Sequence, residues 1–349
     1  MTVEVTLPFL FVQLFLVCVS VGWYALIFAT GCGINNSMNE EEAVSTKPSK
    51  KRLLWIPFGI SMAAVGAAVG VSSYAAFSMT TVVRVPIEGT PDACGLRYSD
   101  ISFPSRDGLT LKGWWLEAGN DKPCIVTVHG EKGHRAESGV MKILDIARDI
   151  VGHGYNVLMF DLRGHGESEG KHASAGYHEK KDLLGAIDYV RQHGISKIGV
   201  IGFSMGAATS LMTAAECKEI DAIVADSSFA DLARVIKFEF SKRSRLPMFF
   251  FPWTAFMANR LYGINLSMLK PVDAVKQTTA PPVLFIHGGQ DDTIPVEHAH
   301  ILASSSRNRD SSLWIVPEAQ HVGSYAVRPE EYLSKVISFF DQTLGVNPA

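Results

Sequence analysis

Two long stretches without a charged residue dominate the first quarter of this 349-residue chain. Residues 5–39 contain no Asp, Glu, Lys or Arg, and neither do residues 53–83. A helix of about 20 apolar residues crosses the hydrocarbon core of a bilayer and pairs its own backbone polar groups. We therefore predict a membrane anchor over residues 1–84, with spans at about 5–30 and 53–79 and a charged link at 31–52.

Each predicted span has an alternative interpretation. The second could be a buried helix of a soluble fold, but its length and its lack of charged residues disfavour this interpretation. The first could be a cleaved signal peptide, but it has Glu4 instead of a basic amino-terminal region, and its apolar run is long for that role. The sequence "FATGC", ending at Cys32, resembles a lipoprotein cleavage site only loosely, because Ala29 stands three residues before the cysteine.

The distribution of Lys and Arg around the spans predicts their orientation. Basic residues gather in cytoplasmic loops, and only Lys and Arg count strongly. None precedes the first span, and only Arg84 and Arg97 follow soon after the second. The link carries four: Lys47, Lys50, Lys51 and Arg52. We expect a cytoplasmic link, with both the N-terminus and the large C-terminal domain outside the cytoplasm.

Composition excludes several classes of partner and cofactor. The net charge is −3 and 19% of residues are charged, so no basic patch indicates nucleic acid. The five cysteines form no CxxC pair, and the glycines form neither a P-loop nor a dinucleotide fingerprint. "EHAH" (297–300) could indicate a metal site, but it falls in a predicted surface helix with no partner motif. We expect no cofactor and no metal, and the sequence leaves the oligomeric state open.

After Arg84, short apolar runs alternate with longer amphipathic ones. Residues 100–118 are predicted to form a hairpin around Arg106-Asp107-Gly108. Strands that are apolar on both faces and separated by helices indicate a mostly parallel sheet covered on both sides. We therefore predict an α/β domain over residues 85–349. Its further strands are "CIVTVHG", "NVLMFDLRG", "KIGVIGFS", "AIVADSSF", "PVLFIHGG" and "SLWIVPEA", and "PEEYLSKVISFFDQTL" is a final helix.

The segment "VIGFSMGAATS" (200–210) passes from a predicted strand into a helix at Ser204. A serine at so sharp a turn has an unfavourable backbone conformation, and side chains two residues to either side would collide. Gly202 and Gly206 remove both clashes. The helix that follows favours negative charge near the hydroxyl. G-x-S-x-G alone occurs often by chance, but at a strand-to-helix junction it predicts a nucleophilic serine.

A serine nucleophile needs a base within hydrogen-bond distance and a third group that orients the base. His321, in "PEAQHVGSY", follows the last predicted strand, with an exposed loop histidine as the alternative. "HGGQDDTIP" offers Asp291 or Asp292 after the preceding strand, and we prefer Asp291. Asp226 is a third candidate that fits a loop brace better. The order Ser204, Asp291, His321 is the one expected of an α/β-hydrolase.

Four motifs between residues 97 and 345 resemble those of the α/β-hydrolase superfamily. They are "VHGEKG" for the oxyanion loop, "FDLRGHGES" for a strand signature, "GFSMG" for the nucleophile elbow and "IHGGQDDTIP" for the acid loop. The chain looks similar to the serine-aminopeptidase and monoglyceride-lipase-like branch, especially to membrane-attached bacterial hydrolases. The resemblance implies that the acid stands four residues after the histidine of the last motif, at Asp291. It also implies an oxyanion hole made by the backbone amides of Glu131 and Met205.

Some residues in these motifs have other expected roles. Glu131 departs from the family pattern, in which smaller or neutral residues are usual. An inward carboxylate would oppose the oxyanion, so we expect this side chain to turn outward; otherwise the site would favour cationic substrates. His129 and His287 are expected to hydrogen-bond within their loops. His165 is expected to help turn the chain, with contact to substrate as the less favoured role.

Residues 230–272 fall where the resembled family inserts a lid. The stretch "RLPMFFFPWTAFMANRLYGI" is rich in aromatic residues and Met. It could pack on the core, line an acyl pocket, or dip into the membrane. Residues 246–257 are too few to cross a bilayer.

Together these features predict a membrane-anchored serine hydrolase that works through an acyl-enzyme. Its substrate would be a small molecule, lipid or peptide with an ester, thioester or amide bond, and acyl esters or lipid-linked substrates are preferred. Aminopeptidase activity is the second choice, and a catalytically idle interaction module is a third. Because neutral His321 would be the base, activity should fall as the pH drops below roughly 6–7.

Overall fold

The computed structural model describes residues 50–137 and 139–345. The first predicted span and most of the charged link lie outside these residues. The second predicted span falls within the helix α2 (Lys50–Thr80). Its part from Pro57 to Thr80 is long and apolar enough, by length and composition, to cross a membrane. One candidate span is therefore found in the described chain, and the prediction of two spans is not confirmed.

The chain divides into two compact units. Among the described residues, the first contains 50–79 and 237–263, and the second contains 80–236 and 264–345. The limits of the two units therefore differ from the predicted domain boundary at residue 84, because the segment 237–263 groups with α2. The division into a membrane anchor over residues 1–84 and a hydrolase domain over residues 85–349 stays a prediction.

The second unit is built around a sheet of eight strands in the order β1-β2-β4-β3-β5-β6-β7-β8. β2 is antiparallel to both of its neighbours, and all pairs from β4 to β8 are parallel. The predicted mostly parallel sheet is confirmed. The strands are β1 (Ser99–Pro104), β2 (Thr110–Leu116), β3 (Cys124–Val128), β4 (Asn156–Phe160), β5 (Ile198–Phe203), β6 (Ala222–Asp226), β7 (Val283–Gly288) and β8 (Ser312–Val316).

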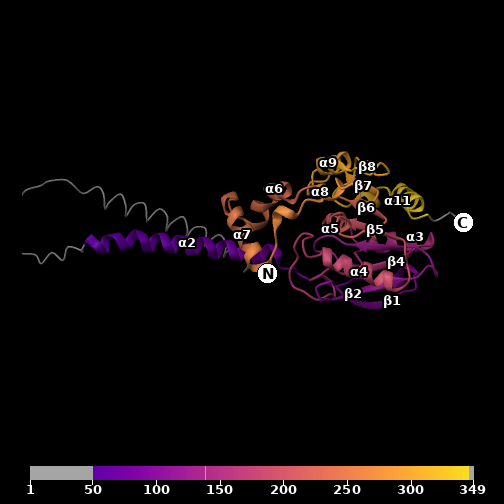
Figure 1. The fold of residues 1–349 in the computed structure, drawn as a ribbon, viewed down its shortest axis with the longest axis horizontal. Helices are drawn as coiled ribbons and strands as arrows, with labels where there is room; N and C mark the ends of the chain where they lie inside the picture. The colour runs from indigo at the N-terminus through magenta and orange to yellow at the C-terminus, as the bar shows by residue number, and fades with distance from the viewer. Residues whose placement is uncertain (1–49, 138, 346–349) are drawn as a thin grey trace, which may run out of the picture. The chain divides into compact units, whose positions relative to one another are not determined.

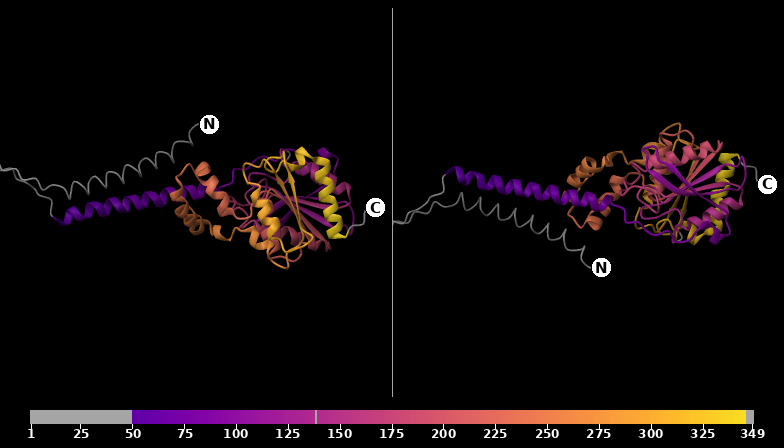
Figure 2. Two further views of the ribbon diagram at one scale, coloured as in Figure 1. Left: turned by 90° about the horizontal axis from the view of Figure 1, so that it is seen from above. Right: turned by 90° about the horizontal axis from the view of Figure 1, so that it is seen from below.

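Helices cover both faces of this sheet (Figures 1 and 2). One face carries α4 (Lys180–Gln192), α5 (Met205–Ala214), α8 (Pro271–Val275) and α9 (Glu297–Ser305). The other carries α3 (Ile143–Gly152) and α11 (Pro329–Leu344). Five consecutive strands, β3 to β7, are buried along their whole length, which explains their continuous apolar sequences. Two hydrophobic clusters result, one on each face.

Short elements complete the connections. They are η1 (Pro91–Cys94), η3 (Leu266–Met268) and α10 (Ser324–Val327). The connection between β6 and β7 holds α6 (Leu232–Ser244), η2 (Met248–Phe250) and α7 (Phe251–Tyr262), together with η3 and α8. The helix α3 starts at Ile143, directly after Lys142, which has a left-handed φ of 52°.

The carboxyl ends of the parallel strands bring several predicted motifs to one edge of the sheet. The loops after β3, β5, β7 and β8 begin there, and they carry His129, Ser204, Asp291 and His321. In open α/β sheets this edge is where ligands bind. The topology thus brings to one edge His129 of "VHGEKG" and His321 of "PEAQHVGSY", which are 192 positions apart in the sequence.

Candidate active site

Ser204 stands alone between the end of β5 and the start of α5. Its φ is 53° and its ψ is −115°, a conformation that non-glycine residues rarely adopt. The backbone amide of Ser204 donates to the carbonyl oxygen of Asp226 at 2.8 Å, which ties the turn to the end of β6. The structure therefore has the strained turn that the motif predicts.

The two glycines of the motif are needed because other backbone passes beside them. A Cβ added at Gly202 would lie 2.6 Å from the carbonyl oxygen of Gly206. A Cβ at Gly206 would overlap the carbonyl groups of Val128 and His129 at the end of β3. The expected clashes are present, and the second of them involves a different strand.

Ser204, His321 and Asp291 form a continuous chain of hydrogen bonds. The Nε2 atom of His321 lies 2.9 Å from the Ser204 Oγ, and its Nδ1 atom lies 2.7 Å from the Asp291 Oδ2. The His321 side chain is 21% exposed, whereas the Asp291 side chain is fully buried. This arrangement lets the imidazole accept a proton from Ser204 while its other nitrogen donates to a carboxylate.

The Asp291 carboxylate is held from two directions. Its Oδ1 accepts the backbone amides of Thr293 at 3.0 Å and Ile294 at 2.8 Å. Its Oδ2, which faces His321, also lies 3.3 Å from His287 Nε2. Burial acts to raise the pKa of Asp291, but the hydrogen bonds from His287 and His321 outweigh it and hold the pKa well below its ordinary value. Asp291 is therefore ionised at neutral pH.

The other two candidate acids lie elsewhere. Asp292 is exposed, and its Oδ1 accepts from the Thr293 hydroxyl at 3.3 Å. Asp226 is buried and accepts from the Ser227 hydroxyl at 3.0 Å, while burial raises its pKa to about 6. The Ser227 hydroxyl in turn accepts the backbone amide of Val322, next to His321. Asp226 thus braces the loops around the site, as expected.

The predicted oxyanion loop lies against the nucleophile. A Cβ added at Gly130 would lie 3.3 Å from the Ser204 Cβ. Met205 is the first residue of α5, so its amide belongs to the helix N-terminus. Glu131 is half-buried and follows Gly130 directly. Met205 thus follows Ser204 directly in the chain, and Glu131 follows the glycine that lies against Ser204. That their two amides form an oxyanion hole stays a prediction.

Two buried histidines hold this loop. His129 Nδ1 donates to the carbonyl oxygen of Gly130 at 2.7 Å, and its Nε2 accepts the Leu162 amide at 3.0 Å. His165 Nδ1 donates to the Arg163 carbonyl oxygen at 2.9 Å, and its Nε2 accepts the Lys132 amide at 3.3 Å. Both rings must be neutral to accept these amides. The expectation for His129 is confirmed, and His165 contacts the oxyanion loop as well as its own turn.

A buried ion pair adds a third link between the same loops. The Asp161 carboxylate accepts the Arg135 backbone amide at 2.7 Å and pairs with the Arg135 guanidinium. Glu167 also pairs with this guanidinium. The motif "FDLRGHGES" includes Asp161, but no local sequence signal marks Arg135 as its partner. His287 was expected to bond within its loop, and it does so at the Ile294 carbonyl oxygen, 2.8 Å away.

The "EHAH" segment has a structural contact of its own. Its His298 lies on α9, is buried, and accepts the Ala230 backbone amide at 3.0 Å through Nδ1. In the described part of the chain, no group of three or more His, Cys, Asp or Glu residues is arranged to hold a metal ion.

The neutral histidines predict that stability falls in mild acid. Burial lowers the pKa of both His129 and His165 in the folded protein, and for His129 the shift is large. An unfolded histidine binds a proton near pH 6.5, so the unfolded state binds more protons than the folded state below that pH. These two groups therefore stabilise the fold fully above about pH 6.5 and less as the pH falls. Each proton of difference amounts to about 1.4 kcal/mol per pH unit.

We expect the melting temperature of the detergent-solubilised protein to fall between pH 7.5 and 5.5, and to fall less steeply in His165→Gln. The raised pKa values of Asp226, Asp182 and His287 act in the opposite direction but are common to both proteins. His153→Gln, at an exposed position after α3, is the control and should keep the wild-type slope. Equal slopes in wild type and His165→Gln would contradict this account.

Comparison with known proteins identifies the family. Residues 145–347 match the prolyl oligopeptidase family. The chain is 31% identical over 244 residues to the uncharacterised protein YqkD of Bacillus subtilis, covering 68% of this chain and 78% of that one. It is 30% identical over 220 residues to the human protein ABHD12B, covering 59% and 58% of the two chains.

Solved structures show the same fold. An esterase of Pyrococcus furiosus is 28% identical, with a TM-score of 0.63 over 75% of this chain and 99% of the esterase. A second structure, Est1E of Butyrivibrio proteoclasticus with bound ferulic acid, is 20% identical with a TM-score of 0.56. The predicted α/β-hydrolase fold and the predicted enzyme class are confirmed. The chain is a serine hydrolase with the α/β-hydrolase fold, and it belongs to the prolyl oligopeptidase family.

Proposed function

We propose that this chain is a membrane-anchored serine hydrolase that cleaves carboxylic ester, thioester or amide bonds with Ser204, His321 and Asp291. The observation that carries the proposal is the chain of hydrogen bonds from Ser204 Oγ through His321 to the buried Asp291 carboxylate. A serine hydroxyl is a weak nucleophile until a base removes its proton, and this geometry provides the base and its orienting acid.

The proposed reaction has two similar halves. Ser204 Oγ attacks the substrate carbonyl while its proton passes to His321 Nε2, and the ionised Asp291 stabilises the imidazolium. The oxyanion that forms would accept the amides of Met205 and Glu131. His321 then gives its proton to the leaving group, which leaves an acyl group on Ser204. A water molecule attacks the acyl-enzyme by the same steps and releases the acid.

Two observations favour different leaving groups. The Pyrococcus furiosus structure is an esterase, and at 28% identity it supports acyl esters as the first choice. The family match to prolyl oligopeptidases supports amide bonds, and hence peptidase activity, as the second. An idle interaction module is disfavoured, since a chain free of catalytic constraint would not need the strained Ser204 turn.

The test is a substrate series with covalent labelling. The solubilised full chain is treated with a fluorophosphonate probe, and the labelled peptide is identified by mass spectrometry. Chromogenic esters of increasing acyl length are then compared with aminoacyl anilides. Label on Ser204 with faster turnover of esters supports the proposal, and faster turnover of anilides moves peptidase activity to first place. A folded wild type without label would support the interaction module instead.

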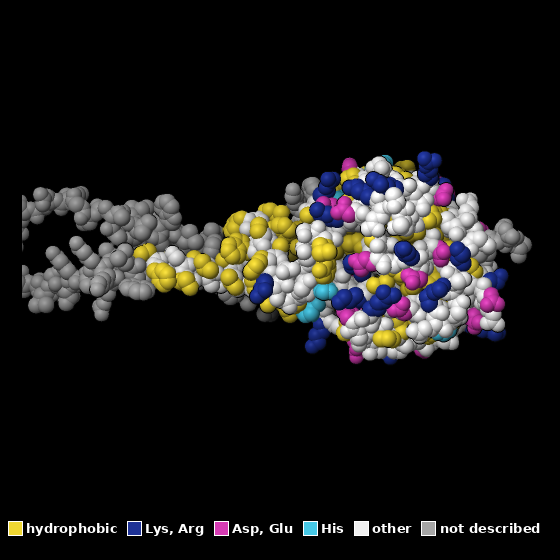
Figure 3. Space-filling view, viewed as in Figure 1, with side chains coloured by type: hydrophobic (Ala, Val, Ile, Leu, Met, Phe, Trp, Pro, Cys, Tyr) yellow, Lys and Arg dark blue, Asp and Glu magenta, His cyan; other side chains and the backbone are white. Residues whose placement is uncertain are grey.

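We further propose that α7 rests on the surface of the membrane that α2 would cross. α7 buries its smaller side chains and exposes its larger ones. Thr254 and Ala258 are buried, while Trp253 is 51% exposed and Phe256 is 57% exposed. Phe249, just before the helix, is 56% exposed and continues the same face at a spacing of four residues. On the face seen in Figure 3, hydrophobic side chains gather over α7.

The charge of this segment fits an anionic bilayer surface. Residues 239–263 contain one acidic residue, Glu239, in a chain whose net charge is −3. The same segment has four basic residues, and all four are exposed: Lys242, Arg243, Arg245 and Arg260. An exposed aromatic face with basic flanks is typical of helices that lie in the interface of anionic bilayers. The segment also belongs to the same compact unit as α2.

Trp253 reports directly on this contact. The full chain is placed in nanodiscs of phosphatidylcholine and phosphatidylglycerol that carry bromine at a shallow position of the acyl chain. We expect the bromine to quench the emission of Trp253, because an interfacial indole lies at the level of the headgroups. The emission of Trp253 is obtained by subtracting the emission spectrum of Trp253→Phe from that of wild type. Trp314→Phe is the matched control for a tryptophan of β8, whose emission should not be quenched.

Three results separate the possibilities. Weaker quenching without phosphatidylglycerol would support the role of the basic residues. If iodide in the water quenches Trp253 and brominated lipid does not, while the chain resists carbonate extraction, the exposed face binds a protein partner instead. If carbonate extracts the chain from the membrane, the proposed membrane anchor is wrong, and so is the proposed contact of α7 with the bilayer surface. The predicted orientation, with the hydrolase domain outside the cytoplasm, is tested separately by protease access in intact cells.

A further inference from the structure

Arg84 fastens the segment after α2 to the loop that follows β4. It stands four residues beyond Thr80, the last residue of α2. Its guanidinium donates to four backbone carbonyl oxygens of residues 165–170. The Nη1 atom lies 3.2 Å from the His165 oxygen and 2.6 Å from that of Gly166. The Nη2 atom lies 2.5 Å from the Ser168 oxygen and 3.0 Å from that of Gly170.

The loop has the conformation needed to present these carbonyls. Gly164, Gly166 and Gly170 all have left-handed φ angles, of 77°, 44° and 100°. The loop therefore curls so that four carbonyl groups converge on one cation. Backbone bonds continue the contact, since the Val82 amide donates to the Lys171 carbonyl oxygen at 3.0 Å. A guanidinium suits such a site because it has five N–H groups in a fixed plane, whereas an ammonium has three on one atom.

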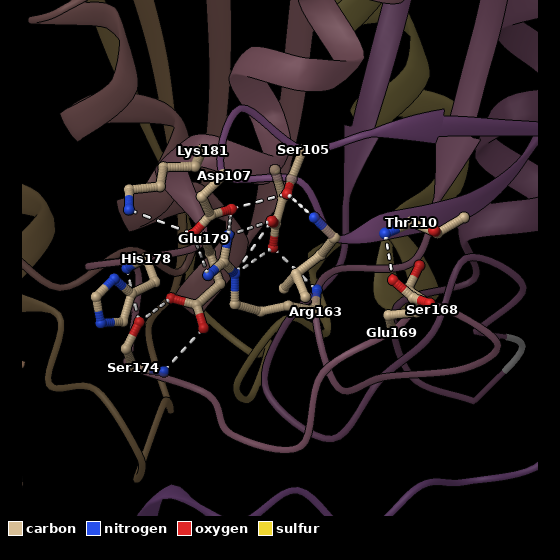
Figure 4. A network of polar contacts seen from close by, with 12 residues as sticks. Ser105, Asp107, Thr110, Arg163, Ser168, Glu169, Ser174, His178, Glu179 and Lys181 are labelled. Carbon is tan, nitrogen blue, oxygen red and sulfur yellow. Dashed lines mark hydrogen bonds and ion pairs between the residues drawn. The ribbon is translucent and has the colours of Figure 1, made fainter. Parts of the chain in front are cut away.

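Side-chain contacts also attach this loop to the rest of the second unit (Figure 4). Arg163 pairs with Asp182 and Asp107, each at 2.7 Å. Glu169 accepts the Thr110 amide at 2.7 Å, at the start of β2. Arg84 adds contacts of another kind, because its bonds go to backbone carbonyl oxygens at residues 165, 166, 168 and 170.

The same loop holds the turn that carries a predicted oxyanion donor. Residues 130–133 form a turn closed by the Gly133 amide and the Gly130 carbonyl oxygen at 3.2 Å. Lys132, its third residue, has a left-handed φ of 62°, which is unfavourable for a residue with a side chain. The Lys132 amide donates to His165 Nε2, and His165 is one of the residues whose carbonyl Arg84 binds. An external acceptor therefore holds a strained turn next to Ser204.

We propose that Arg84 is a positioning residue for catalysis: by fixing the loop 164–170 it holds His165, and His165 holds the oxyanion turn at 130–133. The inference rests on the proposed function, because it takes Glu131 as an oxyanion donor. It gives the segment that leaves the membrane anchor a part in catalysis, although Arg84 touches neither substrate nor triad.

Arg84→Ala and Arg84→Lys test this link, with Arg97→Ala as the control at an exposed arginine of the same segment. We expect Arg84→Ala to lower kcat by about tenfold to a hundredfold, since a small displacement of a reacting group has effects of that size. KM should stay within about twofold, because ground-state binding does not use the oxyanion hole. Arg84→Lys should be intermediate, and Arg97→Ala should match wild type.

Three further readouts separate positioning from mere loss of folded protein. Rates are expressed per site titrated with fluorophosphonate, which removes the effect of any unfolded fraction. The inhibition constant of a boronic acid, which mimics the tetrahedral intermediate, should rise in proportion to the fall in kcat/KM. Hydrogen exchange of the peptide covering residues 129–136 should be faster in Arg84→Ala and unchanged in Arg97→Ala, whether or not the enzyme turns over any substrate.

A second pair of variants acts at the other end of the link and serves if Arg84→Ala does not fold. His165→Gln keeps a strong acceptor for the Lys132 amide, and His165→Met has a side chain of similar size with only a weak one. Methionine should lower kcat per site about tenfold more than glutamine does. Unchanged kcat and boronic acid affinity in Arg84→Ala, or equal rates in the two His165 variants, would overturn the inference. If wild type itself is not labelled, the proposed function fails, and faster exchange at 129–136 would still show the link.

Discussion

Replacing Ser204 with alanine is expected to abolish turnover, with kcat lower by about a millionfold and no labelling by fluorophosphonate. The substitution removes only the hydroxyl whose Oγ lies 2.9 Å from His321 Nε2, and with it the atom that would carry the acyl group. His321, Asp291 and the predicted oxyanion amides remain, so a small rate above that of water is expected to survive. Steady-state hydrolysis of a chromogenic ester, with gel fluorescence of the labelled protein, measures both effects.

This loss should not come from unfolding. Alanine keeps a Cβ and therefore the same strained φ of 53°, and the backbone bond from residue 204 to the Asp226 carbonyl remains. We expect the melting temperature to change by only a few degrees, as for the loss of one partly exposed hydrogen bond. Ser304→Ala, at an exposed serine of α9, is the control for labelling and should behave as wild type. Undiminished turnover in Ser204→Ala would exclude the acyl-enzyme mechanism.

The elements that build the site could be predicted because their causes are local. Strands β3 to β7 are buried on both faces, and the sequence shows this as continuous apolar runs. The need for glycine at 202 is likewise local, because a Cβ there would meet the backbone of Gly206, whereas the clash at Gly206 involves the end of β3 and is not local in the sequence. Once the strands are placed, their carboxyl ends meet at one edge of the sheet. Ser204, Asp291 and His321 follow β5, β7 and β8, so the topology brings them to that edge.

The contacts around the site could not be predicted, because they depend on how loops far apart in sequence pack. Arg84 binds carbonyls 81 to 86 residues away, and backbone carbonyls carry no sequence signal. Arg135 and Asp161 pair across two loops, and only Asp161 lies in a recognisable motif. The contact of Asp291 with His287, which adds to the predicted contact with His321, also depends on the turn after β7.

The buried face of α7 could not be predicted for a different physical reason. Its sequence is apolar almost all round the helix, so periodicity does not show which face is buried. The structure shows that the small residues Thr254 and Ala258 are buried and the large residues Trp253 and Phe256 are exposed. The usual rule that large apolar residues lie inside is reversed here, and this reversal is the observation behind the proposed contact of α7 with the membrane surface.

Asp291→Asn has the second largest expected effect and decides between two adjacent acids. The Asp291 carboxylate is buried, ionised and 2.7 Å from His321 Nδ1, so this nitrogen carries the proton and Nε2 is free to accept one from Ser204. An asparagine amide can donate to Nδ1 instead, which places the proton on Nε2 and removes the base. We expect kcat to fall by about 10³–10⁴-fold, as in other triads whose acid becomes an amide.

Asp292→Asn is the matched control, because it makes the same chemical change one residue away. Its side chain is exposed and bonds to Thr293, so turnover should stay near the wild-type value. Asp226→Asn tests the third candidate, and it should affect stability more than chemistry because Asp226 bonds to Ser227 and not to the base. A large loss in Asp292→Asn with little loss in Asp291→Asn would exchange the two assignments. A loss confined to Asp291→Asn would assign the acid of the triad to Asp291, whose Oδ1 accepts two backbone amides while its Oδ2 faces His321.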